Sequence, residues 1–279
     1  MTHAGCHISI RNGYAGAART AVRLGATAFQ YFPKNPRGLA VKEFDQADAA
    51  ACAAICREHG IRSIAHTTYA TNLAAEGALR EATVRSLRND LDIADACESI
   101  GVVVHFGKWK SGHDPLDGYK LILSALNETL DGRLGEAKLL IENQAGEGTG
   151  IGTTMEELTS IRSFAERPEM IGFCLDTCHL FASGVWDGTN GESLLKLGRD
   201  IGFFTHLMAV HVNDSVYPAG SRRDRHANIG RGAIGEEALG ALLRTEELAS
   251  LPLVLETPVL RGETHAPEIA LLRSIVSNK

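Results

Sequence analysis

The chain has 279 residues, of which 44% are hydrophobic, and a formal net charge of −6 at pH 7. This length can bury a large core, the apolar runs are far shorter than the roughly 20 residues of a transmembrane helix, and the N-terminus lacks the features of a signal peptide. We therefore expect a soluble, cytoplasmic protein with reduced cysteines and no membrane partner, and the negative charge excludes a protein that coats nucleic acid through bulk positive charge.

Eight short apolar runs alternate with amphipathic helical segments along the chain, one of which is predicted over residues 80–100. The predicted strands are CHIS (6–9), TAFQYF (27–32), SIAH (63–66), VVVH (102–105), LLIEN (139–143), GFCLD (172–176), MAVHV (208–212) and LVLE (253–256). Such alternation favours a parallel sheet with helices outside it. We predict one α/β domain over residues 1–279, a (β/α)8 TIM barrel.

Side chains that can bind metal stand at six successive predicted strand ends. They are His66, His105, Glu142, Asp176, His211 and Glu256, separated by 39, 37, 34, 35 and 45 residues. Eight strand–helix units in a chain of this length repeat about every 35 residues, and catalytic groups of such barrels lie at the C-terminal ends of the strands. The spacing predicts a metal site at that face of the barrel. Within the sixth strand, alternation should turn Cys174 and Asp176 inwards and Phe173 and Leu175 towards the helices.

Three further candidate ligands lie in loops just beyond strand ends, namely His179, Asp224 and His226. The nine candidates comprise five imidazoles and four carboxylates, a set that suits zinc or manganese and contains no thiolate. Cys174 and Cys178 flank Asp176, but their spacing does not match a paired cysteine zinc site. Three divalent cations would offset the formal charge of −6.

Several blocks of the sequence resemble the signature blocks of a known protein family. GFCLDTCHLFASG, HVNDS followed by GSRRDRHANIGRGAIG, LLIENQAGEGTGIG, AHTTYATNLA and LVLETP resemble, in order along nearly the whole chain, the endonuclease IV family of apurinic/apyrimidinic endonucleases. The resemblance implies a zinc-dependent DNA repair enzyme that hydrolyses the phosphodiester 5′ to an abasic site, leaving a 3′-hydroxyl and a 5′-deoxyribose phosphate. Its partner would be double-stranded DNA containing abasic sites, without an obligate protein partner.

The resemblance also implies a site of three Zn²⁺ ions, with Mn²⁺ as an alternative at one or more positions. His66 and His105 would hold one ion, and Glu142 would bridge it to a second, completed by Asp176, His211 and Glu256. His179, Asp224 and His226 would hold the third. Glu142 and Glu256 are the expected catalytic carboxylates. A hydroxide between the paired ions would attack phosphorus, and the third ion would stabilise the departing 3′ oxygen.

Asn35, Arg37 and Tyr69 match positions of the family's recognition loops and are expected to contact DNA, with Tyr69 filling the hole in the base stack. Further DNA contacts are expected at Lys108 and Lys110, beside the ligand His105, and at Arg223 and Arg225, among the candidate ligands of the DRH segment. His7, Asn72, Asn143, Asn213 and Asp214 are expected to orient the ligands. Two positions depart from the family pattern. HFGKWKSG replaces HPGS or HPGA and could add phosphate and stacking contacts, or it could be a surface loop with an anchored tryptophan. Ala70 stands where leucine is frequent.

Two other functions remain open from the sequence. A metal-dependent sugar isomerase or epimerase could use Glu142, Asp176, His211 and Glu256 around one ion on the same barrel, and the fold alone does not decide between these activities. The other five candidate ligands would then have no purpose. A catalytically silent DNA- or sugar-binding barrel would be expected to have lost ligands, and none is missing.

Overall fold

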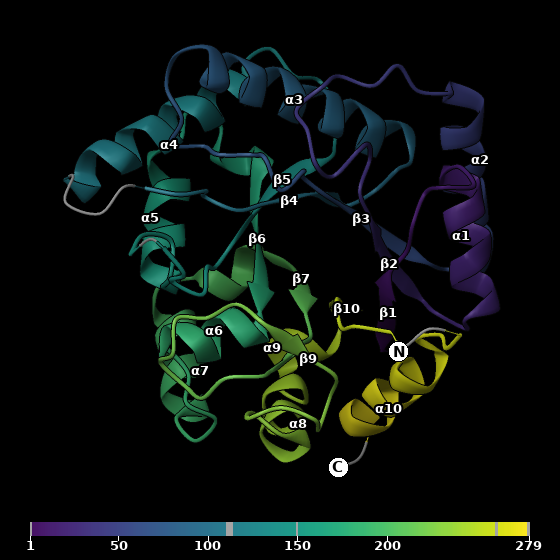
Figure 1. The fold of residues 1–279 in the computed structure, drawn as a ribbon, viewed down its shortest axis with the longest axis vertical. Coiled ribbons are helices and arrows are strands. Elements are labelled where there is room, and N and C mark those ends of the chain that lie inside the picture. The colour runs from purple at the N-terminus through teal and green to yellow at the C-terminus, as the bar shows by residue number, and fades with distance from the viewer. Residues whose placement is uncertain (1, 110–113, 149, 260–261, 278–279) are drawn as a thin grey trace.

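The computed structural model describes residues 2–109, 114–148, 150–259 and 262–277. Eight parallel strands close into a barrel in the order β1-β10-β7-β6-β5-β4-β3-β2 (Figure 1). Their bounds are β1 His3–His7, β2 Ala28–Tyr31, β3 Arg62–His66, β4 Gly101–Val104, β5 Lys138–Glu142, β6 Ile171–Asp176, β7 Leu207–His211 and β10 Pro252–Leu255. The predicted (β/α)8 TIM barrel and all eight of its strands are confirmed.

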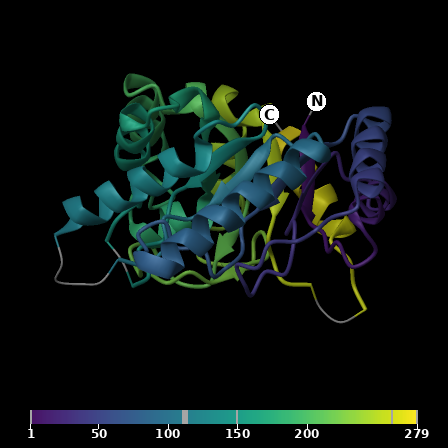
Figure 2. The same cartoon turned by 90° about the horizontal axis from the view of Figure 1, so that it is seen from above.

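Helices surround the barrel. They are α1 Tyr14–Arg23, α2 Gln46–His59, α3 Gly77–Ala96, α4 Pro115–Leu130, α5 Met155–Phe164, α6 Thr177–Ser183, α7 Gly191–Asp200, α8 Glu236–Leu243, α9 Glu246–Ala249 and α10 Ala266–Ser277. Figures 1 and 2 both place α1 beside α2 and α3 beside α4. Two short strands, β8 Asp214–Ser215 and β9 His226–Ala227, form an antiparallel pair outside the barrel. Within the described part of the chain, no helix is long and apolar enough to cross a bilayer.

Two predicted elements have different bounds in the structure. The first strand spans His3–His7 rather than residues 6–9, because His3, Ala4 and Gly5 already pair with β10, and β1 lies between β10 and β2. A Cβ on Gly5 would lie 1.6 Å from the carbonyl oxygen of Ala28. The helix predicted over 80–100 is α3, which ends four residues earlier because Glu98 has a positive φ of 51° that turns the chain towards β4.

Side chains alternate between the two faces of each barrel strand and so form two separate apolar clusters. The inner cluster holds the fully buried Ala28, Ile64, Val103, Leu140, Cys174, Ala209 and Val254. The outer cluster packs the opposite faces of the strands against the helices. Phe173 and Leu175 belong to it, and the ring of Phe173 stacks on Phe203 with centroids 4.7 Å apart. The predicted alternation along β6 is therefore confirmed.

Candidate metal centre

A ring of eight polar side chains lies one inward step beyond the inner apolar cluster. Each barrel strand contributes one member, two residues after its preceding inward position: His7, Gln30, His66, His105, Glu142, Asp176, His211 and Glu256. Parallel strands bring their C-terminal ends to one mouth, and alternate residues share a face. Six of these eight residues are the ligands predicted at strand ends, and they meet as the spacing requires.

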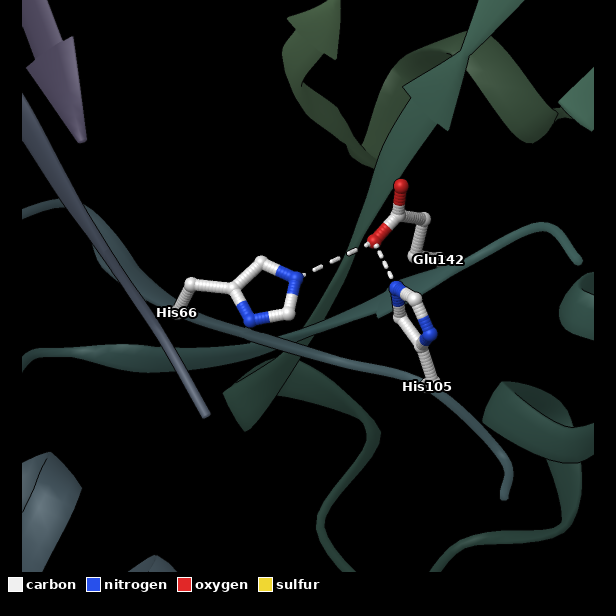
Figure 3. A group of neighbouring side chains, drawn as sticks. All are labelled: His66, His105 and Glu142. Atoms are coloured by element: carbon white, nitrogen blue, oxygen red, sulfur yellow. Dashed lines mark ion pairs between the residues drawn. The ribbon is translucent and has the colours of Figure 1, made fainter. Parts of the chain in front are cut away.

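The first candidate ion position lies between His66, His105 and Glu142 (Figure 3). Nε2 of His105 lies 2.7 Å and Nε2 of His66 lies 3.6 Å from the same oxygen, Oε2 of Glu142. The other nitrogen of His66, Nδ1, is 2.8 Å from the carbonyl oxygen of Thr67. Because a carbonyl accepts a hydrogen bond, Nδ1 carries the proton and the lone pair of Nε2 faces Glu142.

The second candidate position is bounded by three carboxylates around one imidazole nitrogen. Nδ1 of His211 lies 2.8 Å from Oε1 of Glu142, 3.3 Å from Oε2 of Glu256 and 3.9 Å from Oδ2 of Asp176. The ligand atoms of these four residues lie within 4.8 Å of one another. Glu142 therefore offers one oxygen to each of the first two positions.

The third candidate position involves residues from outside the ring. Oδ2 of Asp224 lies 3.3 Å from Nε2 of His179, and Oδ1 lies 3.2 Å from Nε2 of His226. Asp176 also takes part, because its Oδ2 lies 3.7 Å from Nε2 of His226. Asp224 comes from the loop between β8 and β9, and its side chain is 39% exposed, whereas His179 is buried on α6. The third position is thus the more open one.

The charges of the site are strongly coupled. Burial alone would raise the pKa of Glu142, but the imidazoles of His211 and His105 hold that pKa well below its usual range. Burial likewise opposes ionisation of Glu256, yet His211 and His66 lower its pKa to about 2. Burial would lower the pKa of His226, but Asp176 and Asp224 raise it to about 9. The buried carboxylates thus stay ionised because the imidazoles beside them stabilise their negative charge.

Divalent metal ions fit this donor set. Oε2 of Glu142 and Nε2 of His179 and His226 are buried, and among the described residues their close polar contacts are with other candidate ligands, without the geometry of a regular hydrogen bond. Each of these atoms points towards a candidate ion position, and a buried polar atom normally has a partner. Cys174 lies close to Glu142 and His211, and Cys178 to Asp224 and His226, but burial raises the pKa of both thiols, which disfavours the thiolate form. The remaining imidazole nitrogens and carboxylate oxygens suit zinc or manganese.

Two buried asparagines hold the ligands in place. The side chain of Asn143 brackets the backbone of Asp176, accepting from its N–H at 2.8 Å and donating to its carbonyl oxygen at 3.1 Å. Asn213 donates to Oδ2 of Asp176 at 2.7 Å and accepts from the N–H of Glu256 at 3.0 Å. Asn72 contacts no ligand in the described contacts and instead donates to the carbonyl oxygen of Lys108 at 3.4 Å.

Asp214, expected to orient a ligand, has a different environment. Its carboxylate accepts hydrogen bonds from backbone N–H groups of Ser215, Gly230, Gly232, Ile234 and Gly235. It shapes the loop that follows β9 rather than touching a metal ligand directly. His7 lies in the ring, with its imidazole 4.5 Å from the ring of Phe32.

Gln30 is the ring member that sequence reasoning missed. It is fully buried at the ring position of β2, and its amide lies within hydrogen-bond distance of His7, His211 and Glu256. A glutamine amide is not a conventional metal ligand, so the residue type alone did not indicate a role in the site. The available signal was positional, because a polar residue stands near the end of the otherwise apolar run TAFQYF.

A cavity of about 700 Å³ opens beside the metal centre. Ligands from the first and third positions line it, together with Tyr69, Lys108 and Arg225. The side chain of Tyr69 is 74% exposed, and its ring lies 5.1 Å from that of Phe32. Arg225 lies 3.6 Å from Glu147, which faces the same cavity. An aromatic ring and two cations therefore accompany the metal ligands at this mouth.

Asn35, Arg37 and Arg223, also expected to contact DNA, are not part of the cavity lining among the described residues. Asn35 and Arg37 occupy an exposed loop after β2, in which Oδ1 of Asn35 accepts from the N–H of Arg37. The guanidinium of Arg223 lies 4.8 Å from the ring centre of Tyr217. Lys110 lies outside the described residues.

Trp109 has the anchored environment that was the second of the two alternatives for its loop. A Cβ on Gly118 of α4 would lie 2.9 Å from its indole, and the ring packs against the outer apolar cluster. The indole therefore anchors its loop on α4 instead of offering a free stacking face, and Lys108 is the described lysine of this loop that reaches the cavity.

Comparisons with known proteins agree with this geometry. The family model described as xylose isomerase-like TIM barrel matches residues 18–275. A relative from Symbiobacterium thermophilum, named probable endonuclease 4, is 44% identical over 98% of this chain and 99% of its own length. The crystal structure of endonuclease IV from Thermus thermophilus has a TM-score of 0.85 and 35% identity, covering 98% of each chain. A 3-keto-D-glucoside 4-epimerase from E. coli, at 14% identity, a TM-score of 0.69 and 99% coverage of both chains, shares the fold alone.

Proposed function

The chain belongs to the endonuclease IV family of the xylose isomerase-like TIM barrels and is a DNA-cleaving hydrolase, and we propose that it is a zinc-dependent repair enzyme that cuts 5′ to abasic sites. The products would be a 3′-hydroxyl and a 5′-deoxyribose phosphate. The observation that carries this proposal is the convergence of nine ligands into three clusters linked by Glu142 and Asp176.

Zinc ions would supply the charge that activates water and neutralises a phosphodiester. The residues of this chain define where that charge would sit. Glu142 turns Oε2 to His66 and His105 and Oε1 to His211, so its carboxylate connects the first two positions. Asp176 connects the second position to the third, since Oδ2 faces both His211 and His226. Two shared carboxylates support a site built for several ions acting on one phosphate.

The cavity wall supports a DNA substrate. Lys108 and Arg225 present positive charge beside the metal ligands, where phosphates of the backbone could bind. Tyr69 projects an exposed ring at the same place, so it could occupy the space left by a base-free sugar turned out of the duplex. We further propose that Asn35, Arg37 and Arg223, which lie beyond the cavity lining, contact the duplex on either side of the lesion.

A sugar isomerase or epimerase remains the second candidate, because Glu142, Asp176, His211 and Glu256 form a complete four-ligand group. The third cluster disfavours it, since His179, Asp224 and His226 would have no role around a single ion. The chain's similarity to epimerases is limited to the fold.

Metal analysis combined with a nicking assay tests the proposal. Gently purified protein should contain close to three zinc-class ions per chain and should nick a duplex with one abasic site, but not an intact duplex of the same sequence. End-group analysis should find a 3′-hydroxyl on the upstream fragment. One ion per chain, no nicking and turnover of a ketose would support the epimerase instead.

A further inference from the structure

Gln30 is the one member of the eight-residue ring that is neither an imidazole nor a carboxylate. Its side chain is completely buried. Oε1 lies 2.7 Å from Nε2 of His211, while Nε2 lies 2.5 Å from Oε1 of Glu256 and 3.3 Å from Nδ1 of His7. A single amide therefore contacts two ligands of the second candidate position and also His7, the ring histidine that is not a predicted ligand.

Chemistry fixes the orientation of this amide. An ionised carboxylate only accepts hydrogen bonds, so the NH2 group of Gln30 must face Glu256 and its oxygen must face His211. Nε2 of His211 must then carry a proton and donate it to that oxygen. The lone pair of the other nitrogen, Nδ1, would then be free to bind an ion at the second position, among the carboxylates of Glu142, Asp176 and Glu256.

The same amide selects one oxygen of Glu256. Oε1 is occupied by the hydrogen bond from Gln30, whereas Oε2 lies 3.3 Å from Nδ1 of His211. The atoms that Gln30 leaves free are therefore the two that face each other across the second position. The contact with His211 is buried and the contact with Glu256 is partly buried, so an unmatched polar group would be costly above all at His211.

We infer that Gln30 is a positioning residue of the second metal position, which sets the tautomer of His211 and the ligating oxygen of Glu256. The inference rests on the proposed metal centre but not on the proposed DNA substrate. Groups that hydrogen-bond to metal ligands typically change metal affinity by roughly 10–100-fold when they are replaced. A residue from β2, a strand without a ligand of its own, thus contributes to the site.

The test compares Gln30→Leu with Gln30→Glu. Leucine is similar in size but neither donates nor accepts, so affinity at the second position should fall roughly 10–100-fold. Glutamate retains an acceptor for His211 but replaces the donor to Glu256 with a negative charge, so its affinity should lie between those of the wild type and Gln30→Leu. Gln144→Leu is the matched control, because this buried amide lines the cavity and donates to the carbonyl oxygen of Ile151, and no hydrogen bond joins it to a candidate ligand among the described residues.

Zinc affinities would be measured by competition with a chelator, and cobalt-substituted protein would report ligand geometry through its visible spectrum. The inference predicts a loss confined to one ion and an altered cobalt spectrum in both Gln30 variants, with Gln144→Leu unchanged. Wild-type affinity and spectrum in both variants would overturn it, as would an equal loss of all ions.

Two outcomes separate this inference from the proposed function. If the wild-type protein bound no second ion, both the proposed metal centre and this role of Gln30 would be refuted. A wild-type protein that binds its metals and shows the predicted effect of Gln30→Leu, yet does not nick abasic DNA, would overturn the proposed substrate and support the inference.

Discussion

Two successive inward layers of the barrel differ by one step along the same strands. The lower layer, from Ala28 to Val254, is apolar, and the upper ring is entirely polar. Depth does not distinguish them, because Glu142, Asp176 and His211 are as completely buried as Leu140. What differs is the partner each layer requires. The lower layer is satisfied by packing, whereas the upper ring holds carboxylates and imidazoles whose charges call for metal ions.

The largest effect should come from the upper ring, in Glu142→Gln. The substitution keeps the size of the side chain but removes the charge shared by the first two ion positions. Cleavage of an abasic duplex should fall by roughly three orders of magnitude or more, because the activated water between the paired ions would be lost. Single-turnover nicking would measure this, with DNA affinity as the control expected to persist. Near-normal cleavage would refute the bridging role.

One step down the same strand, Leu140→Ala should produce the opposite pattern. The buried side chain touches no ligand position, and truncating a buried leucine costs about 2–5 kcal/mol of unfolding free energy. Denaturant unfolding should show this loss, while the metal content of the folded protein should stay unchanged. Leu134→Ala is the control, since Leu134 is 96% exposed and its truncation should leave stability almost unaltered. Loss of metal in folded Leu140→Ala would show that the layers are not separable.

The buried ion pair of Lys34 and Asp90 contrasts with the upper ring, because the positive charge of Lys34 balances the carboxylate without a metal ion. Nζ of Lys34 lies 2.8 Å from Oδ1 of Asp90, with both side chains almost fully buried. Burial raises the pKa of Asp90 to about 6 from an ordinary value of 3.8, although Lys34 opposes the shift. The folded protein therefore binds a proton more readily than the unfolded chain, and the stability contributed by Asp90 falls as pH rises from about 4 to about 6.

Asp90→Asn isolates this contribution, since asparagine does not titrate. The stability of the wild type relative to Asp90→Asn should be greater at pH 4 than at pH 7 by up to about 3 kcal/mol. Denaturant unfolding at the two pH values measures it, and effects of acid on the metal ligands cancel because both proteins share them. A difference independent of pH would contradict the shifted pKa.

The sequence predicted the ring well because strand-end spacing and ligand chemistry are both one-dimensional signals. Six ligands followed from the repeat of the barrel. The remaining three were predicted in loops, but only Asp224 lies in one, since His179 lies on α6 and His226 begins β9. Gln30 was missed because an amide is not a conventional metal ligand, and its role emerges only when β2 is placed between β1 and β3. The sequence left the role of Trp109 open for a related reason, since the surface that receives its indole belongs to α4 and does not follow from the local sequence pattern.

The smallest expected effect lies outside both layers, at Lys108 on the cavity wall. Lys108 is exposed and lines the cavity together with the ligand His105. Trp109 anchors the loop, so it is left unsubstituted in this test. If Lys108 contacts one phosphate, Lys108→Ala should weaken DNA binding modestly and reduce the slope of log affinity against log salt by roughly one unit. Lys120→Ala is the matched control, because this exposed lysine on α4 pairs with Asp117 and does not line the cavity. Metal content should be the same in both variants. An unchanged salt slope in Lys108→Ala would restrict the DNA-binding charge to other residues of the cavity, with Arg225 as the next cation to test, since it lines the same cavity from a different loop.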